Sequence, residues 1–350
     1  MPVESTVGDT GSDMLYGPRI PSAPGLLKLL HSTCEQLTAA EQKLIICKFD
    51  LERFSTDSRK LQFYTGFKNY HLLTQFFEWL QPTAQLMAYP YFKKTNIVVR
   101  GRQRVLVLID EFFLVMCRLH AGLLVEDLAD RFQISVSTCS RIFLAWINLL
   151  YVVLGSVNIW PSSECVSKFR PVLMKDKFPS VRVIVDCTEI FVQKPSSLVA
   201  NTQFFSSYKS HATFKGLLGI APHGAVVFVS SLYSGSISDV ELTKSSGLLD
   251  LLEAGDSVMA DKGFTIGKLL AERNCRLVIP HFLSCLAQFS ASEVADNDAI
   301  TACRVHVERA IRRIKESRIL QGILPLTLIG SANQILTVCC LMSNFRSDLF

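Results

Sequence analysis

The sequence has no C-x-x-C pair, although 11 of its 350 residues are cysteine. It therefore lacks the regular ligand spacing of a zinc ribbon. It also has no signal peptide at its start, no internal repeat and no low-complexity tract. We expect reduced thiols in an intracellular protein, because an odd number of irregularly spaced cysteines does not describe a disulfide framework.

Charged residues are also few. Asp, Glu, Lys and Arg make up 19% of the chain and hydrophobic residues 49%, which is typical of a globular protein. The net charge of +5 is too small to indicate a partner, so local clusters of charge matter more. A chain of this length is expected to form two domains rather than one.

A long uninterrupted apolar run is missing as well. Residues 319–345 contain no charged side chain, but Pro325, Gly330 and Asn333 interrupt them. The remaining apolar stretches fall short of the roughly 20 residues that a bilayer requires. We therefore expect no membrane span and, instead, a buried last helix that begins near Ala332.

The N-terminal half has the pattern of a helical region. Residues 1–25 are rich in Gly and Pro and predict a flexible leader without structure before Leu26. Residues 26–155 carry apolar side chains at helical spacing, and Pro82 is expected to end the helix that covers residues 70–80.

Within that region, residues 103–154 predict a helix-turn-helix. Three helical segments follow one another, and "QIS" at 133–135 forms the short turn before the last, where Ser135 or Ser137 would cap the recognition helix. The preceding residues 91–104 are basic and contain no acid, which is typical of either a solvated loop or a nucleic-acid contact. A trihelical unit can also be plain scaffolding. The candidate DNA contacts here are Arg102, Arg104, Ser137 and Arg141.

The C-terminal half predicts an α/β domain. Residues 156–180, with three prolines, form a linker, and from 181 the apolar period changes to two. "PHG" at 222–224 suits a tight hairpin with Gly224 at a positive φ. The predicted order is β-β-β-α-β-α-β-α over residues 181–350. Its strands are expected at 181–192, 214–221, 225–233, 257–260 and 276–280, and its last helix at about 299–318.

Three carboxylates in this half are candidates for a shared site. Asp186 is expected at the end of the first strand and Asp261 after the fourth, which would be neighbours in the sheet. Glu308 lies on the last predicted helix, on one face with Arg304, Arg312 and Lys315. Alone, Glu308 would be a surface residue paired with its arginines. Three clustered carboxylates require cations, and hard divalent ions such as Mg²⁺ or Mn²⁺ prefer oxygen ligands.

Two other aspartates are considered as the second ligand. Asp239 begins a predicted helix in "SISDVEL" and is expected to cap it, whereas Asp256 lies at the entry of the fourth strand. Neither is therefore expected to meet Asp186. In "YKSH", Lys209 is a further candidate for contact with a DNA backbone, although a structural loop explains that segment equally well.

The sequence resembles the DDE-superfamily endonucleases of PIF/Harbinger-type transposases, particularly the animal branch that often carries an N-terminal THAP zinc finger. The resemblance rests on "VDCTEIFVQKPS", "YKSHATFKGLLGIAPHGAVVFVS", "SGSISDVELTKSSGLLDLL", "GDSVMADKGF", "LVIPHF" and "RVHVERAIRRIK", and it covers roughly residues 58–345. Residues 1–57 contain only His31, Cys34 and Cys47, too few for the THAP zinc site.

The resemblance implies an RNase H-like catalytic domain and the triad Asp186, Asp261 and Glu308, the last two separated by the 46 residues 262–307. It further implies a nuclear endonuclease that cuts DNA by two-metal phosphoryl transfer with Mg²⁺ or Mn²⁺. Arg304, Arg312 and Lys315 would then face DNA phosphates. Self-association and an accessory DNA-binding partner stay open. The alternative is a domesticated, non-catalytic DNA-binding or adaptor protein of transposase origin.

Overall fold

The computed structural model describes most of the chain, in several segments. These are residues 23–87, 104–196, 202, 204–206, 209–281 and 291–346. Contacts divide the chain into two compact units, Met1–Phe49 and Asp50–Phe350. The predicted leader at residues 1–22 lies outside the described residues.

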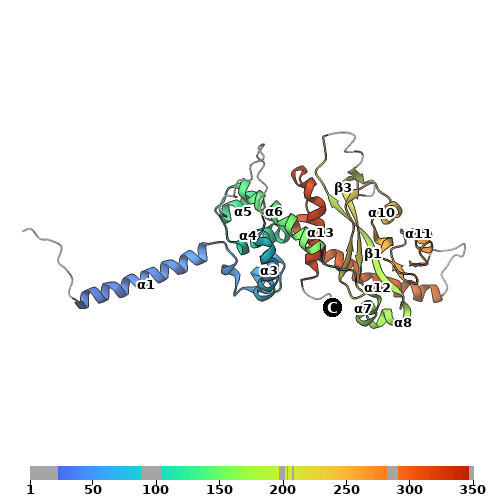
Figure 1. The fold of residues 1–350 in the computed structure, drawn as a ribbon, viewed down its shortest axis with the longest axis horizontal. Helices are drawn as coiled ribbons and strands as arrows, with labels where there is room; N and C mark the ends of the chain where they lie inside the picture. Colours follow the sequence, from blue (N-terminus) through green and yellow to red (C-terminus); the bar gives the residue numbers. More distant parts are fainter. Residues whose placement is uncertain are drawn as a thin grey trace, which may run out of the picture. The chain divides into compact units, whose positions relative to one another are not determined.

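The first unit contains one long helix, α1, Ala23–Cys47 (Figure 1). It begins before Leu26, so the prediction of no structure ahead of Leu26 is wrong for Ala23, Pro24 and Gly25. Pro24 is tolerated because N–H groups in the first turn have no intrahelical partner in any case.

The second unit opens with helices that pack around aromatic side chains. The ring centroid of Phe112 lies 5.9 Å from that of Phe76 and 5.6 Å from that of Trp146. These rings come from different helices, so they tie the helical region together. Its elements are η1 (Glu52–Phe54), α2 (Ser58–Thr65), α3 (Tyr70–Gln85), α4 (Leu108–Met116), the π-helical turn η2 (Cys117–Ala121), α5 (Val125–Arg131) and α6 (Val136–Gly155).

Pro82 does not end α3, contrary to the prediction from sequence. The helix continues to Gln85, with Pro82 in its last turns. A proline removes one N–H hydrogen bond, to the carbonyl four residues earlier. Leu80 and Ala84 are both fully buried, so continuing the helix keeps its apolar face in the core. Burial outweighs the lost bond.

The helix-turn-helix has the predicted form, with α5 and α6 joined by a short turn. Gln133 provides the turn with φ at 53°, and the Ser135 hydroxyl accepts a hydrogen bond from the Thr138 N–H at 3.2 Å, which caps α6. Leu128 and Ala129 are buried beneath the turn. Of the two capping candidates, Ser135 is the one that caps.

The predicted linker at 156–180 contains two short helices, α7 (Ser163–Phe169) and α8 (Val172–Lys177). Val166 and Met174 are fully buried, and the Arg170 guanidinium donates a hydrogen bond to the Val181 carbonyl at 2.8 Å. The segment therefore packs against the beginning of the sheet rather than merely joining two halves. Its helices are too short to show a clear apolar period in sequence.

A mixed sheet follows, with strand order β2-β3-β1-β6-β7 and with β4 and β5 also paired to β3. β1 is antiparallel to β3 but parallel to β6, which is parallel to β7. The predicted adjacency of the first and fourth predicted strands, which correspond to β1 and β6, is confirmed. The strands are β1 (Val181–Phe191), β2 (Phe205–Ser206), β3 (His211–Ile220), β4 (Val226–Val229), β5 (Tyr233–Ser234), β6 (Ser257–Met259) and β7 (Arg276–Val278).

Helices cover both faces of this sheet (Figure 1). The predicted last α/β helix is α12, which begins before the expected position 299 and ends at Lys315. Gly224 has φ at 94° in the β3–β4 turn, as predicted. The elements are α10 (Asp239–Ser245), η3 (Leu248–Asp250), α11 (Gly267–Ala271), α12 (Ala291–Lys315), η4 (Arg318–Leu320), η5 (Leu326–Ser331) and α13 (Ala332–Ser343).

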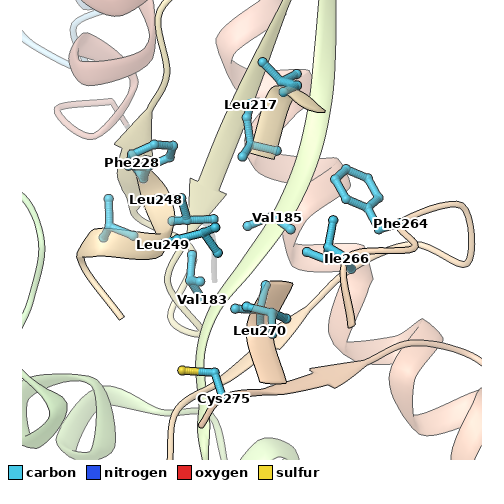
Figure 2. Packing of buried hydrophobic residues seen from close by; sticks show 14 of the residues in the cluster. Val183, Val185, Leu217, Phe228, Leu248, Leu249, Phe264, Ile266, Leu270 and Cys275 are labelled. Carbon is cyan, nitrogen blue, oxygen red and sulfur yellow. The ribbon is translucent and has the colours of Figure 1, made fainter. Parts of the chain in front are cut away.

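Alternate residues of β1 face opposite sides of the sheet. Val183 and Val185 belong to a core cluster with Leu217, Phe264 and Leu270, which Figure 2 shows packed together around β1. Because side chains alternate along a strand, the even-numbered residues, Asp186 among them, point to the other face. Helix α12 packs against β1.

The last helix, α13, begins at Ala332 as predicted and is buried. Two described segments, Val136–Gly155 and Leu326–Ser343, are long and apolar enough to cross a membrane by length and composition, each with mean hydropathy 1.5. Each segment is partly buried, and α6 and α13 pack against each other. That packing supports the expectation of a buried last helix.

Candidate active site

Asp186 lies in the middle of β1 rather than at its end, so this part of the sequence prediction is wrong. The strand continues to Phe191, because its outer half still pairs with β3, where Asp186 lies opposite Leu218. The parallel partner β6, however, ends earlier, and its last pair joins Ile184 to Met259. Asp186 is therefore inside the sheet but just past the end of the parallel ladder.

Asp261 occupies the matching place on the neighbouring chain segment. It follows Met259 by two residues, as Asp186 follows Ile184, so the two aspartates are in register beyond the last paired residues. Each carboxylate accepts a hydrogen bond from the next backbone N–H, Cys187 at 2.8 Å and Lys262 at 2.7 Å. The predicted meeting of Asp186 and Asp261 thus has a structural basis in the β1–β6 register.

Glu308 lies on α12, which packs against β1. Glu308 and Asp186 line one open pocket, together with Ile311, Arg312, Lys315, Glu316 and Gln321. Glu308 forms no ion pair with the described residues, so the simple picture of a glutamate neutralised by its helix neighbours does not describe it. Its carboxylate is exposed towards the pocket that Asp186 shares.

Several charges act on Asp186. Burial raises the pKa of its carboxyl group, and the negative charges of Asp261 and Asp239 raise it further, whereas the Cys187 N–H and the Arg304 guanidinium oppose this. Crowded carboxylates of this kind favour a bound cation. The pKa of Lys315 is lowered, first by burial and then by the neighbouring Lys209, while Asp186 and Glu189 act in the opposite direction.

Arg304 is the cation that pairs with Asp261. Its guanidinium lies 3.0 Å from the Asp261 carboxylate, and only 17% of its side chain is exposed. Among the described residues, no group of three or more His, Cys, Asp or Glu side chains is arranged to hold a metal ion. The carboxylate oxygens of Asp186, Asp261 and Glu308 are the kind of ligand that Mg²⁺ and Mn²⁺ prefer. The Asp261 carboxylate, however, is paired with Arg304.

Asp239 does not cap its helix, contrary to the sequence prediction. Ser238 caps α10 through the Glu241 N–H at 3.2 Å. The Asp239 carboxylate instead lies 2.7 Å from the Lys215 ammonium and accepts a hydrogen bond from the Cys187 thiol at 3.2 Å. Sequence reasoning missed this side of the site. The sequence signal for this was Ser238 directly before Asp239. Serine caps a helix as well as aspartate does, so Asp239 is available for other contacts when Ser238 is the cap.

Arg104 has partners within the helical region, and 25% of its side chain is exposed. Its guanidinium lies 3.0 Å from the fully buried Glu111 carboxylate and donates to the Met87 carbonyl at 2.6 Å. The Trp146 indole N–H donates to the same Glu111 oxygen at 2.9 Å. Residues 91–104 contain no acid, but the partner of Arg104 is Glu111, which follows seven residues later on α4. Arg102 lies outside the described residues.

The other DNA-contact candidates, except Arg304, are more accessible. Ser137 and Arg141 are exposed on the first turns of α6, where the Arg141 guanidinium donates to the Ser137 hydroxyl at 3.3 Å. Lys209 is exposed near Lys315, and its carbonyl lies 3.0 Å from the His211 ring. Arg312 and Lys315 line the pocket with Asp186, whereas Arg304 faces Asp261.

Family comparison matches both halves of this arrangement. Residues 185–344 match the DDE superfamily endonuclease. Residues 104–156 match the helix-turn-helix of the DDE superfamily endonuclease. A search of curated proteins gave no match.

The endonuclease match covers Asp186, Asp261 and Glu308, and the helix-turn-helix match covers α4, α5 and α6. The fold is therefore a helical region with a helix-turn-helix, followed by a mixed sheet with helices, and it is consistent with an α/β RNase H-like DDE domain. This confirms the fold class expected from sequence.

Proposed function

We propose that this protein is a divalent-metal-dependent DNA endonuclease of transposase origin. The carrying observation is that Asp186 and Asp261 lie in register just past the parallel pairs of β1 and β6, while Glu308 shares a pocket with Asp186. The matched endonuclease domain supports a phosphodiester as the substrate. Within that family, the motifs favour the PIF/Harbinger-type branch.

Asp186, Asp261 and Glu308 would hold the cations. When bound, Mg²⁺ or Mn²⁺ would supply a Lewis acid that activates water and stabilises the leaving oxygen of the phosphodiester. The chain's own part is to fix Asp186 within the sheet and Asp261 just beyond β6, where each carboxylate is oriented by the N–H that follows it. Lys315 and Arg312, beside the pocket, would hold the charge of the DNA backbone.

The helix-turn-helix would bring DNA to this site. Ser137 and Arg141 are exposed at the start of α6, the position at which recognition helices contact DNA. A protein that cuts chromosomal DNA would act in the nucleus. The target sequence would be read by this helical region.

The test is a nicking assay on candidate terminal-repeat DNA with Mg²⁺ or Mn²⁺. Glu308→Gln should reduce nicking at least about 100-fold with the fold unchanged, because an amide keeps the shape but removes the charge. Asp261→Asn should also abolish cleavage. Asp256→Asn should leave it nearly intact, because Asp256 lies at the entry of β6 and its carboxylate binds the Glu253 N–H at 2.9 Å.

Glu316→Gln is the matched control for Glu308, since Glu316 lines the same pocket just after the end of α12, about two helical turns from Glu308. It should cut at close to the wild-type rate. Normal cleavage by Glu308→Gln would refute the catalytic role. Metal-dependent DNA binding without cleavage of any supplied end, by a protein with an intact fold, would favour the domesticated, non-catalytic protein instead.

A further inference from the structure

The ion pair between Arg304 and Asp261 presents a conflict for the proposed site. The guanidinium contacts Asp261 Oδ1 at 3.0 Å, and the Lys262 N–H contacts the same oxygen at 2.7 Å. A divalent cation at Asp261 would meet a positive charge already in place. Two cations competing for one carboxylate repel each other strongly at such distances.

Arg304 also acts on the other aspartate. Its positive charge is among the influences that hold down the pKa of Asp186, against burial and against Asp261 and Asp239. One guanidinium thus serves both carboxylates that lie in register on β1 and beyond β6. It comes from α12, one helical turn before Glu308, so it belongs to the same element as the third acidic residue.

We propose that Arg304 is a displaceable counter-ion, which occupies the place of the metal at Asp261 until a DNA phosphate draws it away. This inference rests on the proposed function, because it assumes that Asp261 binds the cation. The guanidinium can exchange one oxyanion for another, since carboxylate and phosphate suit its planar fork equally. Arg304 is therefore a positioning residue, and Asp261 binds metal best when DNA is present.

Binding of metal and binding of DNA are then mutually favourable. DNA releases Asp261 by taking Arg304, and metal releases Arg304 by taking Asp261. By thermodynamic linkage, the factor by which DNA raises metal affinity equals the factor by which metal raises DNA affinity. A site built in this way stays neutralised without DNA.

The experiment measures Mn²⁺ affinity from the paramagnetic resonance signal of free Mn²⁺, with the full chain. Four proteins are compared: wild type, Arg304→Gln, Arg309→Gln and Asp261→Asn. Arg309 is exposed on the same helix, so Arg309→Gln removes an equal charge without touching Asp261. Each titration is repeated with a short DNA duplex, and Mn²⁺ bound by the duplex alone is subtracted.

We expect Arg304→Gln to bind Mn²⁺ about threefold more tightly than Arg309→Gln without DNA, the scale of a partly exposed ion pair. DNA should tighten Mn²⁺ binding to the wild type and to Arg309→Gln by about threefold more than it does to Arg304→Gln. Equal affinities of the two arginine variants, or an equal effect of DNA on both, would overturn the inference.

Asp261→Asn separates this inference from the proposed function. If it removes Mn²⁺ binding while the two arginine variants behave alike, the metal site stands and only the counter-ion role fails. If neither the wild type nor Arg304→Gln shows Mn²⁺ binding that depends on Asp261, the metal site and the counter-ion role fail together.

Discussion

Asp186 is a carboxylate held inside a sheet, with a raised pKa caused first by burial and then by Asp261 and Asp239. A raised pKa means that the folded protein binds the proton more tightly than the unfolded chain does. Stability from this group is therefore present at low pH and is lost as the pH rises from the unfolded pKa through the folded pKa. At neutral pH and without metal, Asp186 costs stability.

Asp186→Asn should consequently raise the free energy of unfolding by about 1 kcal/mol at neutral pH, the usual size of stability recovered at a strained functional position. The asparagine oxygen can still accept the Cys187 N–H. The gain should shrink towards low pH, where Asp186 is protonated in both states, and denaturant unfolding across pH measures it. A variant that is less stable at neutral pH, or a gain that is independent of pH, would contradict this account.

Individual elements were predictable where one local pattern decides them. The start of α13, the Ser135 cap of α6 and the Gly224 turn follow from apolar period, capping chemistry and backbone freedom. The β1–β6 pairing was also predicted from the order of the strands. Contacts far apart in sequence decide the rest: β3 extends β1 past Asp186, and Glu111 on α4 captures Arg104. No local pattern reports either of these.

The contact of Arg104 with the buried Glu111 on α4 yields a prediction about stability. Arg104→Ala should lower the free energy of unfolding by about 3 kcal/mol, because the buried Glu111 carboxylate loses a cationic partner. Arg141→Ala, at an exposed position, should change stability by less than about 0.5 kcal/mol while weakening DNA binding. Chemical denaturation and a DNA titration on both variants decide this. Unchanged stability with weaker DNA binding for Arg104→Ala would restore the DNA-contact interpretation.

Across the Asp50–Phe350 unit, α13 joins the helical region to the sheet. It packs on α6 and β4, and the Asn333 side chain accepts the Leu232 N–H at 3.0 Å while donating to the Tyr151 hydroxyl at 3.4 Å. The Asn344 amide pairs with both the N–H and the carbonyl of Val226, each at 2.9 Å. The two regions thus share one core, and we expect them to unfold together.

Leu336→Ala tests that expectation, since Leu336 is fully buried on the side of α13 that faces β3. It should lower stability by about 3 kcal/mol and shift the fluorescence transition of the tryptophans in the helical region as much as the circular-dichroism transition. Leu326→Ala, at a partly exposed position in η5, is the control and should shift both far less. Separate transitions in Leu336→Ala would show that the regions unfold independently.

The position of α13 also has a consequence for biosynthesis. This helix is translated after every element that it joins, including α6, whose residues leave the ribosome some 180 positions earlier, as the Tyr151–Asn333 separation of 182 shows. The apolar surface of α6 that packs against α13 therefore stays exposed until α13 has been translated. A nascent or truncated chain without α13 would expose apolar surface on both regions, and chaperones rather than DNA would be its first partners.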